Sequence, residues 1–196
     1  MQLNISAILT AAGLSKRMGC DKLLLEFNGV TLLQRAVDLL SELSVSEKIL
    51  ITIEERLERL VVPQGIQIII NENPETGHSS SVRLGIETAN KFRHISHYLF
   101  LVADQPKLTK ADIQQIIDAG EINQDKIIYP VINDKPNTPS LFPIKFSDEL
   151  LKISGDTGGR VIRDLYLKSC LAIPPINPDR FTDINTMEDY NALNDC

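Results

Sequence analysis

The chain has 196 residues, of which 43% are hydrophobic and 23% charged, the proportions of an ordinary globular domain. Its 20 basic and 26 acidic side chains leave a net charge of −6, which argues against a nucleic-acid-binding surface built on bulk positive charge. No apolar run approaches the roughly 20 residues that span a bilayer, and "MQLNISAILTAAG" lacks a basic leader, so we expect a cytoplasmic protein without a membrane partner.

Apolar patterns with the periods of strands and helices alternate along the chain. The segment 3–10 is a nearly continuous apolar run, typical of a strand covered on both faces. In chain order the patterns predict strand 3–10, helix 31–43, strand 47–53, helix 54–61, strand 66–70, helix 80–92, strand 97–103, helix 110–120, strand 126–132, helices near 146–153 and 157–168, strand 170–173 and a helix from 186 onward.

Polar and small residues mark the ends of several predicted helices. Thr31, Thr109 and Thr186 are suitable N-caps, and Gly120 is the expected C-terminal stop of helix 110–120. Gly85 lies inside a helical pattern that its apolar neighbours nevertheless maintain. Strands that alternate with helices imply right-handed crossovers. We therefore expect one α/β domain over residues 1–196, Rossmann-like, with a mainly parallel central sheet and helices on both faces.

The loop after the first strand is a candidate anion site. Ligands of open parallel sheets bind outside the carboxyl ends of the strands, where Ala11, Ala12 and Gly13 leave the backbone N–H groups accessible. Arg17 and Lys22 supply cations that suit phosphate oxygens. The pattern matches neither GxxxxGK[ST] nor GxGxxG. On spacing alone, an anion site and an ordinary turn with a solvated basic edge are equally consistent with it.

Histidines and cysteines provide no obvious centre. His78, His94 and His97 form no convincing metal or nucleophile set, and His94 and His97 are expected at the surface because they flank the start of a strand. The cysteines are widely scattered and include no CxxC pair, which favours a reducing compartment over a disulfide framework or a structural zinc site. They are Cys20, Cys170 and Cys196.

The stretch "TAAGLSKRMGCDKLL" resembles the signature loop (L/T)AAG-x-S-x-R-M-G-x-x-K of nucleotidyltransferases that activate cofactors and sugars. Within this family it most resembles the molybdenum cofactor cytidylyltransferase group. Further matches follow in the same order over nearly the whole chain: "TGHSSSVRLGI", "VADQP", "PSLFP", "SGDTGGR" and "DINTMEDY". The resemblance implies a fold of the nucleotide-diphospho-sugar transferase type.

The resemblance also implies a nucleotide site. Backbone around Ala11, Ala12 and Gly13 would contact the base and phosphates, and Arg17 and Lys22 would bind the phosphates. The Ala-Ala form of the loop resembles the one associated with cytidine nucleotides, whereas guanylyl-transferring relatives carry Ala-Gly-Gly.

A second segment is implied to lie beside the nucleotide. Ser81 matches a serine next to the nucleotide in related cytidylyltransferases, and Gly77 would permit close approach. A helix N-cap is an equally good explanation of the three consecutive serines.

Two carboxylates are implied to bind Mg²⁺. Asp104 directly follows a buried strand, where a cap or turn role is the alternative, and Asp183 precedes the terminal helix. Magnesium prefers one or two carboxylates together with phosphate oxygens and water. The family commonly has Asp-Ile-Asp-Thr-Pro around Asp183, and Asn185 and Met187 depart from that pattern.

The acceptor side of the site is implied to include Thr138, Asp156 and Arg160. Relatives often carry Gly-His-Pro or Gly-Asn-Pro where this chain has Asn137 and Thr138, so the pterin side is expected to differ. For Asp156, an N-cap of helix 157–168 is the alternative.

These features predict a Mg²⁺-dependent enzyme that transfers CMP from CTP to a phosphate acceptor and releases pyrophosphate. Lys22, Arg17 and Asp104 would be the catalytic residues. The implied acceptor is molybdenum-bearing molybdopterin, and a recipient molybdoenzyme or its chaperone is the implied partner. The alternatives are a cytidylyltransferase acting on a sugar or polyol phosphate and a non-catalytic module that binds nucleotide or cofactor.

Overall fold

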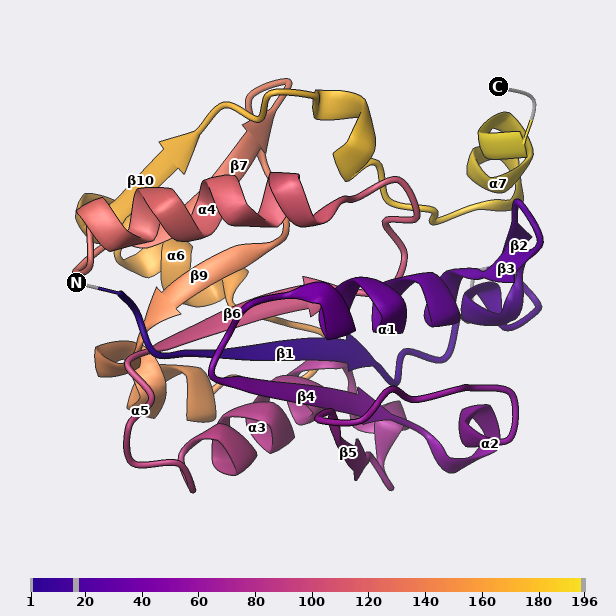
Figure 1. Ribbon diagram of the computed structural model, residues 1–196, viewed down its shortest axis with the longest axis horizontal. Coiled ribbons are helices and arrows are strands. Elements are labelled where there is room, and N and C mark those ends of the chain that lie inside the picture. The colour runs from indigo at the N-terminus through magenta and orange to yellow at the C-terminus, as the bar shows by residue number, and fades with distance from the viewer. Residues whose placement is uncertain (1, 16–17, 195–196) are drawn as a thin grey trace.

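A mixed sheet forms the centre of the computed structural model, which describes residues 2–15 and 18–194 (Figure 1). The strand order is β10-β7-β9-β6-β1-β4-β5, and β8 pairs with β7. The strands are β1 (Ile5–Ala11), β4 (Glu47–Thr52), β5 (Gln67–Ile70), β6 (His97–Val102), β7 (Ile127–Ile132), β8 (Lys135–Pro136), β9 (Ser140–Pro143) and β10 (Cys170–Ile173). A separate hairpin consists of β2 (Glu26–Phe27) and β3 (Val30–Thr31).

Most strand pairs are parallel, as the alternating pattern predicts. β1 pairs in parallel with β4 and β6, β4 with β5, and β7 with β10. The exceptions in this sheet are β8, which pairs antiparallel with β7, and β9, which lies antiparallel between β6 and β7. The sequence analysis assigned no strand to this segment, because it has only four residues and ends in proline. The expected α/β class is confirmed as a mostly parallel mixed sheet.

Seven α-helices are found in the described part of the chain. They are α1 (Leu32–Glu42), α2 (Glu54–Leu57), α3 (His78–Ala89), α4 (Lys110–Ile122), α5 (Ser147–Leu151), α6 (Arg160–Leu165) and α7 (Met187–Asn194). Short 3₁₀ turns cover Lys22–Leu24, Pro74–Thr76, Ile144–Phe146, Leu167–Ser169 and Pro178–Phe181.

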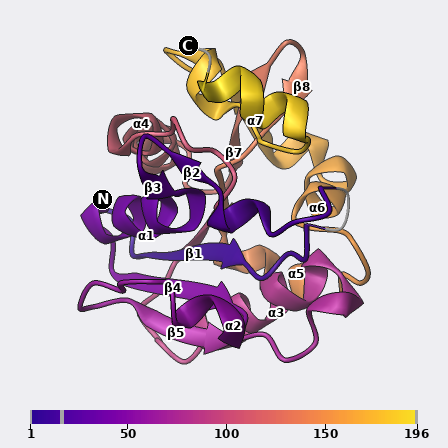
Figure 2. The same ribbon diagram turned by 90° about the vertical axis from the view of Figure 1, so that its right-hand side faces the viewer.

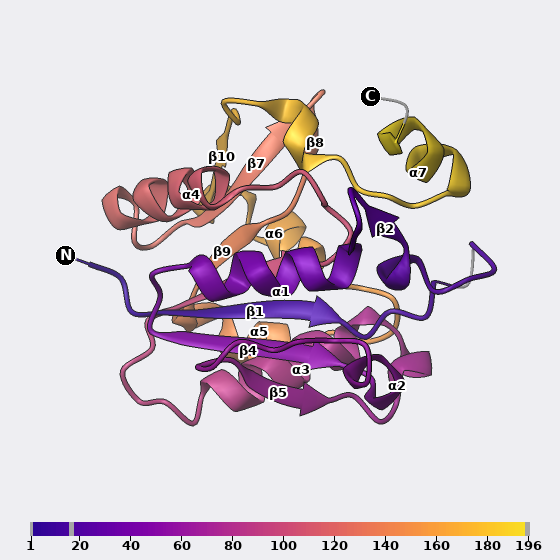
Figure 3. The ribbon, with the colours of Figure 1, turned by 45° about the vertical axis from the view of Figure 1, so that its right-hand side comes forward.

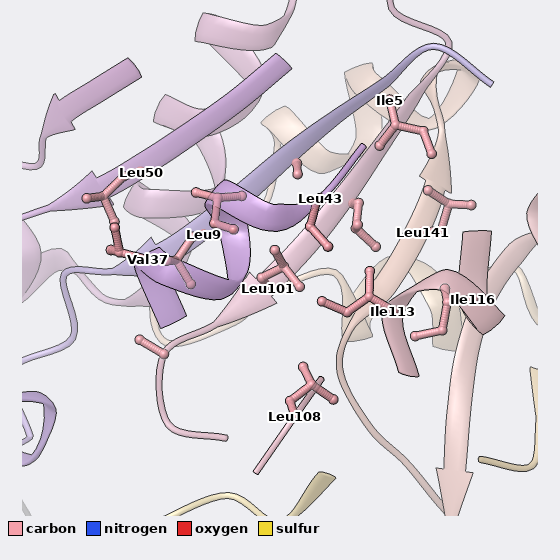
Figure 4. Packing of buried hydrophobic residues seen from close by; sticks show 14 of the residues in the cluster. Ile5, Leu9, Val37, Leu43, Leu50, Leu101, Leu108, Ile113, Ile116 and Leu141 are labelled. Atoms are coloured by element: carbon pink, nitrogen blue, oxygen red, sulfur yellow. The ribbon is translucent and has the colours of Figure 1, made fainter. Parts of the chain in front are cut away.

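The helices bury the two faces of the sheet in separate cores, since successive residues of a strand point to opposite faces. Leu9 packs with α1 and α4 residues such as Val37 and Ile113 (Figure 4). Its neighbour Ile8 packs on the other face with α3 residues such as Ile86. A Cβ at Gly85 would overlap the Ile8 side chain, so this glycine lets α3 lie close to β1.

Helix ends follow the cap residues in some places and tertiary packing in others. Thr31, Thr109 and Thr186 cap their helices through side-chain oxygens, as predicted. Gly120 is not a stop, because α4 continues to Ile122; a Cβ at this position would overlap Leu141 of β9, so the glycine serves packing. Asp156 is not an N-cap, because α6 begins only at Arg160.

The last helix returns to the beginning of the chain. α7 lies beside the β2–β3 hairpin (Figure 3), and Leu193 packs with Leu32 and Ile184 in a small third core. The Tyr190 hydroxyl donates to the Glu26 carbonyl at 2.7 Å. The segment before α7 is thereby held against the first loop.

Of the two histidines expected at the surface, one lies in the interior and the other is exposed. The expectation of a surface His97 is wrong: its ring is buried, and Nε2 donates to the Gln124 carbonyl at 2.9 Å. His94 is half exposed beside Glu47.

Cys20 is exposed, and like Cys170 it is a free thiol. None of the helices in the described residues is both long and apolar enough to cross a membrane.

Candidate active site

A cleft of about 630 Å³ opens where the first loop, the N-terminus of α3 and the segment after β6 meet. The carboxyl ends of β1 and β4 lie on the side of the molecule that Figure 2 turns toward the viewer. Site residues predicted from the sequence form much of the cleft wall: Ala12, Gly13, Lys22, Gly77, Ser81, Asp104 and Asp156.

A lysine–carboxylate pair lies in this wall. Lys22 Nζ is 2.6 Å from Asp104 Oδ2 and also donates to the Ile184 carbonyl at 2.9 Å. The two charged side chains are only 16% and 19% exposed. Asp104 Oδ1 is buried and has no hydrogen-bond partner among the described residues. One carboxylate oxygen is therefore neutralised by Lys22, and the other remains available.

A second carboxylate, that of Asp183, lies close enough to Asp104 for their charges to interact. Asp183 Oδ1 accepts a hydrogen bond from Gln105 Nε2 at 2.9 Å. Burial, together with the negative charge of Asp104, raises the pKa of Asp183 from 3.8 to about 6. The negative charge of Asp104 is thus close enough to disfavour ionisation of Asp183.

Asp104 and Asp183 together fit a divalent cation. A cation between them would supply the partner that Asp104 Oδ1 lacks and would relieve the repulsion that raises the pKa of Asp183. Within residues 2–15 and 18–194, no group of three or more His, Cys, Asp or Glu side chains is placed to hold a metal. Two carboxylates leave room for phosphate oxygens and water, which is the ligand set that Mg²⁺ prefers.

The N-terminus of α3 packs tightly against the loop over 154–159. Gly77 has φ +100°, and a Cβ there would overlap the carbonyl of Gly155. The Ser79 amide donates to that same carbonyl at 3.1 Å. Gly77, rather than any of the three serines, is the residue before the helix, so the N-cap explanation of the serines is wrong.

Ser81 lines the cleft, and a hydrogen bond from Asn71 fixes the orientation of its hydroxyl. Asn71 Nδ2 donates to Ser81 Oγ at 3.0 Å and to Ser80 Oγ at 2.8 Å. An oxygen that accepts from the amide keeps its own hydrogen for another acceptor. Ser81 can therefore donate a hydrogen bond to a ligand in the cleft.

Ala11, Thr138 and Arg160 lie apart from the residues that line the cleft. Ala11 is buried at the end of β1. Thr138 precedes a cis peptide to Pro139 and accepts from Gln105 Nε2 through its carbonyl at 3.1 Å. The Arg160 side chain is 81% exposed beside Asp164. Arg17 lies outside the described residues, and the roles given to all these residues stay predictions.

The sequence analysis missed four residues around the site. Arg56 and Asn71 support the first loop and the serines, and Gln105 binds Asp183, although nothing in their local pattern marks them. His78 lines the cleft, and burial lowers its pKa, against the opposing effect of Asp156 and Asp104.

A mostly parallel sheet with a small-residue first loop and a lysine–aspartate pair at its carboxyl edge places this chain among the α/β proteins that bind ligands at that edge. Comparison with known families agrees with this class. The profile of the MobA-like NTP transferase domain matches residues 7–170, so the chain belongs to this family.

Curated relatives differ in the nucleotide and acceptor that their names give. The chain is 30% identical over 86 residues to a probable molybdenum cofactor guanylyltransferase of Pyrococcus horikoshii, covering 42% of this chain and 45% of that protein. It is 29% identical over 114 residues to the 2-C-methyl-D-erythritol 4-phosphate cytidylyltransferase of Corynebacterium jeikeium, covering 57% and 40%. The matches thus span less than half of either relative.

Solved structures share the fold along its full length. Rv0371c of Mycobacterium tuberculosis superposes with a TM-score of 0.81 at 23% identity, and the match covers 100% of both chains. A manganese complex of Rv0371c gives a TM-score of 0.76 at 22% identity over 98% of both chains. At this identity the likeness concerns the fold alone.

Proposed function

We propose that this protein transfers CMP from CTP to a phosphate group of molybdenum-bearing molybdopterin and releases pyrophosphate. The observation that carries the proposal is the buried pair of Lys22 and Asp104 in the cleft, with one oxygen of Asp104 left without a partner. This arrangement offers a fixed cation for phosphate and a carboxylate for a metal side by side. The family membership supports nucleotidyl transfer as the reaction class.

The reaction asks mainly for positioning and charge neutralisation. An acceptor phosphate oxygen attacks the α-phosphorus in line, and the bond to pyrophosphate breaks. Lys22 binds the phosphates, and Ala12 and Gly13 leave room for them at the cleft wall. Asp104 and Asp183 would hold Mg²⁺, which supplies neutralisation of phosphate charge when bound. The manganese complex of Rv0371c supports a divalent metal in this fold.

No general base is needed in this proposal, because a phosphate acceptor is already ionised at neutral pH. Burial lowers the pKa of His78, so its neutral imidazole adds no positive charge to that of Lys22. Arg17 would hold the leaving pyrophosphate.

The choice of base and acceptor rests on the sequence of the first loop. Ala-Ala-Gly favours cytidine, and the names of the relatives include both a guanylyltransferase and a cytidylyltransferase. A sugar or polyol phosphate is the alternative acceptor, and the Corynebacterium jeikeium relative supports it. The alternative in which the protein is not an enzyme is a non-catalytic module that binds nucleotide or cofactor.

Thermal unfolding with CTP, GTP, ATP and UTP, each with and without Mg²⁺, tests the proposal. A ligand at 100 times its Kd stabilises the folded state by about 2.7 kcal/mol, which a melting curve resolves. We expect CTP, and none of the other three nucleotides, to raise the melting temperature in a Mg²⁺-dependent way. This rise should be lost in Asp104→Asn. A shift with GTP or ATP would overturn the choice of base.

Pyrophosphate release with molybdenum-bearing molybdopterin, methylerythritol phosphate and no acceptor then distinguishes the functions. Release with the pterin alone supports the proposal, and release with the polyol phosphate supports the alternative enzyme. Nucleotide binding without release for any acceptor would favour the binding module.

A further inference from the structure

Arg56 is a buried charge on a short helix. It belongs to α2, which follows the carboxyl end of β4, and its side chain is only 2% exposed. A buried guanidinium persists only when its charge and its N–H groups are satisfied. Its partners therefore show what it holds in place.

Within the described part of the chain, the hydrogen-bond partners of the Arg56 side chain belong to the two ends of the first loop. Nε donates to Asp21 Oδ2 at 2.7 Å, and Nη2 donates to Asp21 Oδ1 at 2.9 Å. Nη2 also donates to the Gly13 carbonyl at 2.7 Å, and Nη1 donates to the Ala11 carbonyl. One planar side chain thus joins the start of the loop to its end.

These contacts fix the direction of the loop's peptide planes. In a planar trans peptide the N–H points opposite to the carbonyl, so carbonyls of Ala11 and Gly13 that face Arg56 turn the following amides away from it. Those amides belong to Ala12 and Leu14, which line the cleft, whereas Arg56 does not. Asp21 in turn accepts from the Leu23 amide at 3.1 Å and directly precedes Lys22.

We propose that Arg56 is a positioning residue which, with Asp21, holds the first loop in the shape that receives the nucleotide phosphates. The inference rests on the proposed function, in that the ligand is a nucleoside triphosphate. The two ends of the loop, at Ala11 and Gly13 and at Asp21, are held before the nucleotide arrives, so binding does not bear the entropic cost of ordering them. Arg56 itself touches no substrate.

Two substitutions separate this role from a contribution to stability. Arg56→Lys keeps the positive charge, but an ammonium cannot reproduce the planar fork that spans Asp21 and both carbonyls. Arg56→Met removes the charge as well. Arg163→Met is the matched control, because Arg163 is a second buried arginine, 8% exposed and packed over Tyr129, and it does not line the cleft.

The experiment measures the Kd of CTP with Mg²⁺, KM and kcat for CTP, and hydrogen exchange of the ligand-free loop in the full-length protein. We expect Arg56→Lys and Arg56→Met to raise Kd and KM by about ten- to a hundredfold, with a smaller fall in kcat. Loop amides over 12–22 should exchange faster in both variants. Arg163→Met should lower the melting temperature and leave Kd within about twofold of the wild-type value.

The outcomes distinguish this inference from the function on which it rests. If wild-type protein binds CTP and Arg56→Lys binds it equally well, the positioning role is wrong and the proposed function stands. If Arg163→Met weakens CTP binding as much as Arg56→Lys, the effect is general destabilisation, and the inference is again overturned. If wild-type protein binds no nucleoside triphosphate, the proposed function and the inference both fail.

Discussion

Asp183→Asn should stabilise the protein at neutral pH while weakening its response to a divalent metal. The substitution removes the negative charge that burial and Asp104 both disfavour. The new amide oxygen can still accept from Gln105 Nε2, as Asp183 Oδ1 does at 2.9 Å. The folded protein therefore loses a repulsion and retains the hydrogen bond.

The magnitude follows from the pKa of Asp183, which is raised from 3.8 to about 6 on folding. At about 1.4 kcal/mol for each tenfold change in proton affinity, the ionised carboxylate costs the folded state about 3 kcal/mol. Between about pH 4 and pH 6 the folded state binds more protons than the unfolded state, so this group lowers the free energy of unfolding as pH rises. Below pH 4 the carboxylate is protonated in both states and the cost vanishes.

Urea unfolding of wild type and Asp183→Asn at pH 4 and pH 7.5 measures this effect. We expect similar free energies of unfolding at pH 4 and an advantage of up to about 3 kcal/mol for the variant at pH 7.5. For a domain of this size, that corresponds to a rise in melting temperature of about 6–12 °C. Added Mg²⁺ should stabilise the wild type more than the variant.

Asp125→Asn is the control, because the Asp125 side chain is 93% exposed and its substitution should change the free energy of unfolding little at either pH. An advantage of Asp183→Asn that is equally large at pH 4 and pH 7.5 would refute the electrostatic reasoning. An Asp183→Asn protein that is less stable than wild type at pH 7.5 would do the same.

Three further substitutions test the site and its packing. Asp104→Asn should reduce pyrophosphate release at least about 100-fold and lower the pKa of Asp183, while the circular dichroism spectrum stays unchanged. Normal turnover in this variant would show that Asp104 does not hold the metal. Gly77→Ala should lower the free energy of unfolding in urea more than Gly65→Ala does, and it should also weaken CTP binding. Both glycines have positive φ, but only Gly77 lies against the Gly155 backbone. Equal losses of unfolding free energy would contradict the overlap. Gly85→Ala should lower the free energy of unfolding by about 1–2 kcal/mol, since overlap with Ile8 outweighs the gain in helix propensity, and a stabilised variant would show that α3 can shift.

The order of strands and helices could be predicted because burial on two faces imposes apolar patterns on local sequence. Strand β1 and helices α1 and α4 show this, together with the threonine caps. The antiparallel β9 could not be predicted in this way, since four residues are too few for a period and its partners are distant in sequence. The stop expected at Gly120 failed for a related reason: contact with Leu141 of that strand, rather than local preference, explains this glycine.

The candidate site likewise contains residues that could be predicted from the sequence and residues that could not. Lys22 and Asp104 could be predicted as cleft residues, because each belongs to the segment that follows the carboxyl end of a strand of one sheet. Arg56 and Gln105 could not, since their bonds reach Asp21 over 35 positions and Asp183 over 78 positions. No local pattern tells a buried arginine or glutamine which distant carboxylate it will meet.

The hydrogen bond from Lys22 Nζ to the Ile184 carbonyl joins residues that are 162 positions apart. The cation proposed to meet phosphate is therefore held partly by the segment before α7, which the ribosome makes after β10. A growing chain that has completed β1 through β10 has the first loop but lacks Asp183 and this carbonyl. Synthesis order itself thus delays these Lys22 contacts until the segment before α7 has been made, and a chain that stops before Asp183 lacks one of the two carboxylates proposed to hold the metal.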